Sequence, residues 1–248
     1  GRDYHVCPFG RLEMMTSRDG GANWTMPRVL TDSAIDDRDS GILETNKGTL
    51  LATCFTSFVY QQHMNKPERL LTPTFGKETP AMLKRWKLMD AATTQEQKQA
   101  ETGHWMLRST DGGLNWSPRY RVPGYSPHGP INLLDGRVFY AAANGKKAVA
   151  LVSEDDGRTW EALADLPVRA GELHAVQAAD GTLVVHVRDK IRTPKGTVQN
   201  TAQTISTDGG KTWSQQQKVA DGYPSHLVRL HDGTLLMTYG WRVEPCGI

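Results

Sequence analysis

Ser206-Thr-Asp208-Gly-Gly210-Lys-Thr-Trp213 is the stretch that decides the fold, because its pattern, Ser-x-Asp-x-Gly-x-x-Trp, occurs four times in 248 residues. The other copies are at 17–24, 109–116 and 153–160. Ser and Asp side chains hold a tight turn by bonding nearby backbone N–H groups, Gly allows a positive φ, and Trp packs beneath the turn. Each copy, called a box below, predicts a turn between two antiparallel strands, and four copies indicate a repeat.

A second turn alternates with the boxes and consists of a Gly followed by an apolar strand. It occurs at Gly48, Gly136, Gly181 and Gly233. Two turn types that alternate at a regular pace predict four-stranded blades of a β-propeller. A β-sandwich also contains many strands, but it would not repeat one motif at this period.

The repeat predicts a single β-propeller domain over residues 1–248 with a partial set of blades. We expect the tail of one blade up to about residue 30, fuller blades at about 34–120, 121–164 and 168–217, and half a blade from about 220. A propeller needs closure to remove its sheet edges. Two explanations of the half blade stay open: further residues after Ile248, or completion by the first strands.

One interval of the repeat is longer than the others and carries a helical pattern near residues 80–100. Thr79 and Pro80 form a helix start, and Met82, Trp86 and Met89 follow at helical spacing. We expect a helical insertion on one blade. It is either a solvated decoration, which we favour, or a lid beside a site.

Composition excludes several classes of protein. A net charge of +2 with 38% hydrophobic residues indicates neither disorder nor a nucleic-acid partner. No stretch reaches the roughly 20 apolar residues of a membrane span, so no membrane insertion is expected. Three scattered cysteines and the lack of clustered Cys/His motifs predict no disulfide framework and no metal site. The first residue, Gly1, indicates a processed or excised piece, and a secreted or periplasmic location is slightly favoured over others.

Alignment of the blades at the second turn shows which residues surround the mouth of the central channel. The strand that leads into each turn is the innermost strand of a blade. The polar residues expected at that mouth are Arg38, Asp39, His128, Glu172, His174, Arg188, Tyr223, His226 and Arg242. A ring of mixed charge at a propeller mouth predicts a ligand site.

These residue types suit the recognition and hydrolysis of an acidic sugar. Arg38 and Arg188 could grip a carboxylate in a bidentate manner. Glu172 beside a Tyr indicates a base that activates a phenol nucleophile, which is preferable to a carboxylate when the reacting carbon itself carries a negative group. Purely structural roles are an alternative for some of these residues. Arg38 can form an ion pair with Asp39, and the three histidines could each form a hydrogen bond to a neighbouring blade.

With these features the chain resembles the sialidase (neuraminidase) superfamily of proteins with BNR or Asp-box repeats. The boxes match the signature turn of that family. The segment Arg38-Asp-Ser-Gly-Ile-Leu-Glu-Thr-Asn46-Lys-Gly48-Thr-Leu-Leu resembles its first-blade segment, and Gly171-Glu172-Leu-His-Ala-Val-Gln-Ala-Ala-Asp180-Gly181 is similar to its Asn-Glu segment. The resemblance implies a six-bladed sialidase-type β-propeller that needs no cofactor.

The resemblance also implies roles for single residues. Arg38, Arg188 and Arg242 would hold the substrate carboxylate, and Glu172 would be paired with the catalytic Tyr223. From their place in the ring, the three histidines are also expected to bind substrate. The implied activity is release of a terminal sialic acid or related acidic sugar, so that the expected partner is a sialylated glycan or other acidic carbohydrate.

The chain departs from the family pattern where an acid/base aspartate is expected. The region 56–63 contains no Asp, so Asp39, Asp37 or His63 would have to substitute. Two alternatives therefore remain beside the sialidase hypothesis. The first is a non-catalytic carbohydrate-binding or scaffold propeller, and the second is a hydrolase or lyase of another acidic sugar, such as a uronic acid.

Overall fold

The computed structural model describes residues 4–66, 79–194, 196–242 and 246–247. It separates into two compact units, one formed by Gly1–Asp39 with Cys54–Trp105 and the other by Ser40–Thr53 with Met106–Ile248. Strands β5 (Leu50–Ser57) and β6 (Gly103–Ser109) contribute residues to both. Each unit is described by itself.

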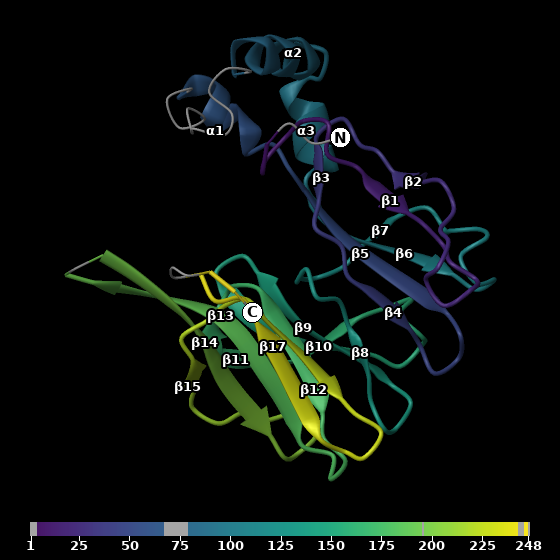
Figure 1. Cartoon of the computed structure of the whole chain (residues 1–248), viewed down its shortest axis with the longest axis vertical. Helices are drawn as coiled ribbons and strands as arrows, with labels where there is room; N and C mark the ends of the chain where they lie inside the picture. Colours follow the sequence, from purple (N-terminus) through teal and green to yellow (C-terminus); the bar gives the residue numbers. More distant parts are fainter. Residues whose placement is uncertain (1–3, 67–78, 195, 243–245, 248) are drawn as a thin grey trace. The chain divides into compact units, whose positions relative to one another are not determined.

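The first unit contains short strands and three helices (Figure 1). Strand β1 (Leu12–Met14) pairs with β2 (Arg28–Thr31), and β3 (Asp36–Arg38) pairs with the end of β5. The helices are α1 (Tyr60–Asn65), α2 (Thr79–Ala91) and α3 (Gln95–Glu101). The helical insertion predicted near 80–100 is thus confirmed as two helices, and α1 is a helix that the sequence pattern did not predict.

Helix α2 packs into a hydrophobic cluster of its own unit. Met82 and Trp86 on α2 are buried with Tyr60 of α1 and Ile35, and the rings of Tyr60 and Trp86 meet edge to face at 6.2 Å. Helix α3 begins with a capping box in which Thr94 and Gln97 bond each other's backbone N–H groups. The insertion is therefore anchored by a core and not only solvated.

The second unit is built from antiparallel sheets. Strand β4 (Ile42–Glu44) pairs with the start of β5, and β7 (Tyr120–Arg121) follows β6 at the edge of that sheet. One four-stranded sheet contains β8 (Ile131–Asn132), β9 (Val138–Asn144), β10 (Lys147–Ser153) and β11 (Glu161–Arg169). The next contains β12 (Leu173–Gln177), β13 (Leu183–Thr193), β14 (Gly196–Ser206) and β15 (Gln217–Ala220), and a hairpin of β16 (Ser225–Arg229) and β17 (Leu235–Tyr239) follows.

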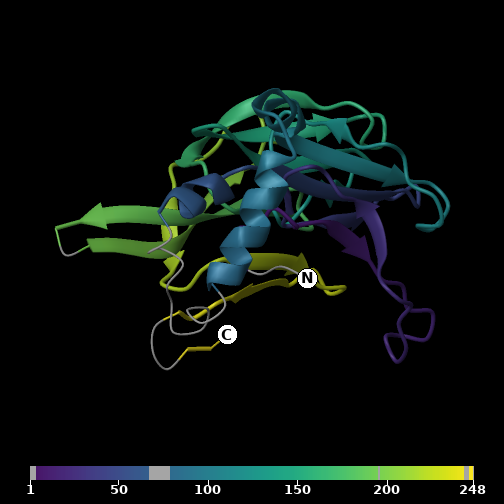
Figure 2. The ribbon, with the colours of Figure 1, turned by 90° about the horizontal axis from the view of Figure 1, so that it is seen from above.

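This architecture is all-β, and both four-stranded sheets keep their strands in chain order. The hairpin β16–β17 lies beside β12, as Figure 1 shows. Strands β13 and β14 pair with each other beyond the part that β12 and β15 cover, so they extend as an arm (Figure 2). No sheet closes on itself within the described residues, so the expected number of six blades stays a prediction. None of the described helices has the length and apolarity needed to cross a membrane.

The four boxes share the hydrogen bonds of Ser, Asp and Gly, and the first, second and fourth also share the bond from the Trp indole to the Gly carbonyl. In the last box the Ser206 hydroxyl donates to Asp208 at 2.8 Å and accepts the Gly210 N–H at 2.9 Å. Asp208 also accepts the backbone N–H of Thr212 at 2.9 Å, and the Trp213 indole donates to the Gly210 carbonyl at 2.9 Å. The predicted role of Ser, Asp and Gly in a tight turn is confirmed.

The boxes also join neighbouring sheets of the second unit. Trp213 lies against Phe139 of β9, with ring centres 6.1 Å apart. Gly157 of the third box lies so close to Leu51 of β5 that an added Cβ would be 2.6 Å from its side chain. The third and fourth boxes are therefore packing elements between sheets, which agrees with a structural role.

We predict that Ser206→Ala lowers stability by about 1–3 kcal/mol, because it leaves the buried Gly210 N–H without an acceptor. For a chain of this size the melting temperature should fall by roughly 2–12 °C. The matched control is Ser17→Ala in the first box, where the Gly21 N–H is exposed and water replaces the hydroxyl. Thermal unfolding followed by circular dichroism measures both, and equal losses would contradict the prediction.

Candidate functional site

Glu172 and Arg188 are brought together by the register of the β12–β13 hairpin. Leu173 pairs with Val187, and the Arg188 N–H donates to the Glu172 carbonyl at 2.9 Å. The two side chains form an ion pair in which Arg188 Nη1 lies 2.7 Å from Glu172 Oε1. Both remain partly exposed, at 20% and 34%. The sequence predicted both residues as site members, and the hairpin explains why they meet.

The Arg188 guanidinium is also held from β14, the strand that pairs with β13 on the edge opposite β12. Its Nε donates to Gln199 Oε1 at 2.8 Å, and Gln199 lies on β14. The pair borders a pocket of about 350 Å³ that is lined by Arg169, Ala170, Gly171, Glu172, Arg188 and Lys190. This lining carries three cationic side chains and one carboxylate, so the pocket favours an anionic ligand.

Tyr223 contacts two arginines predicted for the same site. The guanidinium carbon of Arg188 is 4.7 Å from the centre of the Tyr223 ring, and that of Arg242 is 5.3 Å from it. Both distances are within the range of cation–π attraction. Arg188 therefore contacts both Glu172 and Tyr223, and Arg242 contacts the Tyr223 ring.

Arg38 and Asp39 lie in the first unit and have their own surroundings there. Arg38 contacts Asp36 at 3.6 Å and Asp39 at 3.7 Å, its Nη2 is 3.0 Å from His5 Nε2, and its guanidinium lies over the Phe55 ring. Asp39 has a positive φ of 41°, which is uncommon for a residue other than Gly. The ion pair between Arg38 and Asp39, which the sequence suggested as a structural role for Arg38, is therefore formed.

The other candidates for an acid/base group occupy different environments. Asp37 is buried and accepts the Ser33 N–H at 2.5 Å. His63 lies on α1, with its ring centre 5.8 Å from that of Tyr4. Asp39, at 36% side-chain exposure, is more accessible than Asp37.

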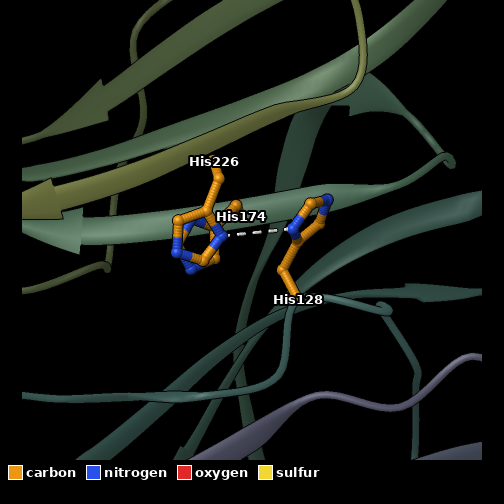
Figure 3. Close-up of side chains that lie close together, drawn as sticks. All are labelled: His128, His174 and His226. Atoms are coloured by element: carbon orange, nitrogen blue, oxygen red, sulfur yellow. Dashed lines mark hydrogen bonds between the residues drawn. The ribbon is translucent and has the colours of Figure 1, made fainter. Parts of the chain in front are cut away.

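His128, His174 and His226 come together in the second unit (Figure 3). The rings of His174 and His226 are stacked with centres 4.0 Å apart, and His226 Nδ1 lies 3.4 Å from His128 Nδ1. His174 Nδ1 accepts the Leu227 N–H of β16 at 2.8 Å, which is the bond to a neighbouring sheet that one reading of the sequence predicts. The three rings border a cavity of about 380 Å³ between β4, β8, β12 and β16.

Desolvation shifts the pKa of all three rings downwards. Burial and then the charge of His226 lower the pKa of His128 to about 4, while Glu172 opposes the shift. Burial and then the neighbouring histidines lower the pKa of His174 to about 2, and burial lowers the pKa of His226. The neutral form of all three rings is therefore favoured, and His174 already uses its one lone pair for the Leu227 N–H.

Sequence reasoning missed several residues that shape these sites. His5 and Asp36 hold Arg38, Gln199 holds Arg188, and Arg169 and Lys190 make the pocket cationic. The alternation of side chains along β14 could have placed Gln199 on the same face as Arg188. The other residues could not be found in this way, because their contacts depend on which segments lie side by side in the fold.

Comparison with known proteins places these sites in a family context. Residues 86–244 match the model of the BNR repeat-like domain family. A sialidase from Micromonospora viridifaciens is 31% identical over 126 residues, which are 42% of this chain and 18% of that protein. A xyloglucanase from Paenibacillus is 29% identical over 164 residues, which are 56% of this chain and 16% of that protein. The chain thus spans less than a fifth of the length of either relative.

Solved structures show the same fold. A protein of unknown function from Dyadobacter fermentans superimposes with a TM-score of 0.71 at 23% identity, over 98% of this chain and 68% of that chain. The NanB sialidase of Streptococcus pneumoniae superimposes with a TM-score of 0.60 at 13% identity, over 95% of this chain and 52% of that chain. At these identities the likeness concerns the fold alone.

We predict that protonation of His128 lowers the free energy of unfolding as the pH falls, at pH values above those at which carboxylates are protonated. Because the folded pKa of His128 is lowered from 6.5 to about 4, its contribution to stability is present above pH 6.5 and is lost as the pH falls towards 4. Between pH 7 and 4.5 the loss should be about 2 kcal/mol. His128→Gln should flatten the fall in melting temperature over this range, whereas the exposed control His231→Gln should follow the wild type. If the melting temperatures of His128→Gln and the wild type fell equally with pH, the role of His128 would be refuted.

Proposed function

The chain belongs to the BNR repeat-like domain family, and on this premise we propose that it is an exo-α-sialidase-like glycoside hydrolase. Its proposed reaction releases a terminal sialic acid or a related acidic sugar from glycoconjugates. The observation that carries the proposal is the Glu172–Arg188 pair, at 2.7 Å, in a pocket with a cationic lining. The sugar hydrolases among the relatives, a sialidase and a xyloglucanase, support the reaction class.

The electrostatics of the pocket support an acidic rather than a neutral sugar. Arg169, Arg188 and Lys190 outnumber the single carboxylate of the lining. A planar guanidinium matches a carboxylate with two parallel hydrogen bonds, and Glu172 and Gln199 hold that of Arg188 in one orientation. Less side-chain entropy is then lost when a ligand binds.

The proposed mechanism uses Tyr223 as the nucleophile and Glu172 as its base. Glu172 takes the phenol proton while the Tyr223 oxygen attacks the anomeric carbon, and the bond to the leaving group breaks. An acid then protonates the leaving oxygen, and Asp39 is the sequence-based candidate for this step. Arg188 and Arg242 beside the ring stabilise negative charge that develops on the phenol. Water finally attacks the anomeric carbon and gives a proton to the deprotonated acid, while Glu172 returns its proton to the Tyr223 oxygen as the sugar–tyrosine bond breaks.

A non-catalytic carbohydrate-binding propeller is the second candidate function. It is favoured by one observation: Glu172 is already bonded to Arg188, which occupies one oxygen of the proposed base. In this case the pocket would bind an acidic sugar, and Glu172 would orient Arg188 instead of moving a proton. A hydrolase of another acidic sugar, such as a uronic acid, uses the same cationic lining.

We predict that Glu172→Gln lowers kcat on a fluorogenic sialoside by about 10²- to 10⁴-fold, because the variant cannot accept the phenol proton. The matched control is Glu161→Gln, an exposed glutamate at the start of β11, which should keep wild-type turnover. Turnover that is unchanged in Glu172→Gln would overturn the mechanism. Binding of the sialoside by the wild type without any product would instead establish the non-catalytic candidate.

We predict that Arg188→Lys raises KM for an acidic sugar about tenfold, which corresponds to about 1.4 kcal/mol. Lysine cannot form the bidentate contact with a carboxylate. It also lacks the planar group that bonds both Glu172 and Gln199. The control is Arg137→Lys, since Arg137 pairs with Asp135 in an exposed turn. Assays on a panel of sialosides, uronides and neutral glycosides would show the sugar class, and an equal KM change for neutral glycosides would contradict carboxylate recognition.

A further inference from the structure

The histidine cluster has a feature that the proposed glycosidase chemistry does not use. His174 lies on β12, His226 on β16, and His128 in the segment that leads into β8, so each ring comes from the inner edge of a different sheet. One nitrogen from each ring can be chosen so that the three lie within 4.8 Å of one another. Figure 3 shows His226 over His174, with His128 facing them.

The spacing of His128 and His226 is that of two ligands on one metal ion. Their Nδ1 atoms are 3.4 Å apart. Zinc binds imidazole nitrogen at about 2.0–2.1 Å in tetrahedral geometry, which places two such nitrogens about 3.3–3.4 Å apart. The same distance also fits one proton shared between the rings, and this is the alternative that a test must exclude.

The donor atoms of the pair are of a kind that transition metals bind. A metal ion needs the unprotonated nitrogen of an imidazole, and the two Nδ1 atoms face each other beside the cavity that both rings line. Imidazole ligands suit zinc, copper, nickel and cobalt better than calcium or magnesium.

His174 has a different place in the cluster. Its Nδ1 accepts the Leu227 N–H, so the proton of the neutral ring is on Nε2 and the ring has no second lone pair to offer. It stacks on His226 with an angle of 17° between the ring planes, and it bonds the residue next to His226. His174 is therefore a positioning residue that holds His226 in the orientation facing His128.

We propose that His128 and His226 bind one divalent transition-metal ion through their Nδ1 atoms, with His174 as the supporting ring. The adjoining cavity of about 380 Å³ leaves room for water or a ligand oxygen at the remaining coordination positions. A metal with open positions can polarise or anchor such an oxygen. This site is independent of the Glu172 chemistry, and it departs from the expectation that the protein takes no metal.

The test is metal binding to the whole chain after treatment with a chelator. Titration with Co²⁺ followed by visible absorption, and with Zn²⁺ by calorimetry, should show one ion per chain in the wild type. His226→Gln and His128→Gln should each weaken binding at least tenfold. His231→Gln removes an exposed histidine five positions after His226 and should bind as the wild type does. His226 is itself exposed, so its substitution is the one least expected to disturb folding.

Thermal unfolding in metal-free buffer establishes that the variants fold. Zn²⁺ should raise the melting temperature of the wild type and of His231→Gln but not that of His226→Gln. Wild-type binding no tighter than that of folded His226→Gln would overturn the proposal, and the contact between the rings would then be a shared proton. Sialoside turnover is measured separately, so failure of the glycosidase proposal leaves this result unaffected.

Discussion

The hydrogen bond from a box glycine N–H to its serine hydroxyl is the interaction on which the second unit depends. In the third and fourth boxes the serine is almost fully buried, so the N–H has little access to water and needs a protein acceptor. The bond holds the turn tight enough for the glycine to touch the next sheet. Gly157 contacts Leu51, and Gly210 lies against Leu163, Leu183 and Phe139. One local bond thus sets both the end of a hairpin and the distance between sheets.

The second turn type controls the candidate site in a comparable manner. The turn at Gly181 fixes Gln177 opposite Leu183, and antiparallel pairing then continues to Leu173 opposite Val187. The next position is Glu172 beside Arg188. A slip of one residue would send one of these side chains to the opposite face of the sheet. The ion pair is therefore a consequence of a glycine turn nine residues away along the chain.

The sequence predicted features that depend on neighbouring residues, but it did not predict contacts that depend on how strands pair. Turns, strand order and the helices near 80–100 follow from short patterns of Ser, Asp, Gly and Pro. The contact between Arg188 and Gln199 depends on the register of a long hairpin, and the helix α1 has no capping signal in its sequence. Identical boxes also differ in surroundings. Trp24 is 58% exposed, whereas Trp213 packs on Phe139, because only the neighbouring sheet decides burial.

The repeat also explains why three histidines gather, but it does not explain why they are histidines. His174 and His226 lie at equivalent positions of β12 and β16, seven residues before Gly181 and Gly233, and His128 lies eight residues before Gly136, so the repeat brings the three to one cavity. His174 has a structural reason, since it satisfies the Leu227 N–H. His128 and His226 have no such reason: the bond described for each Nδ1 is to the other ring. Their cavity is also lined by Ile42, Leu43, Val176 and Leu227, where aliphatic side chains would be buried without desolvating a polar group. The pair thus places two imidazole nitrogens side by side in a lining that also contains aliphatic side chains, and this is the arrangement that the proposed metal ion would use.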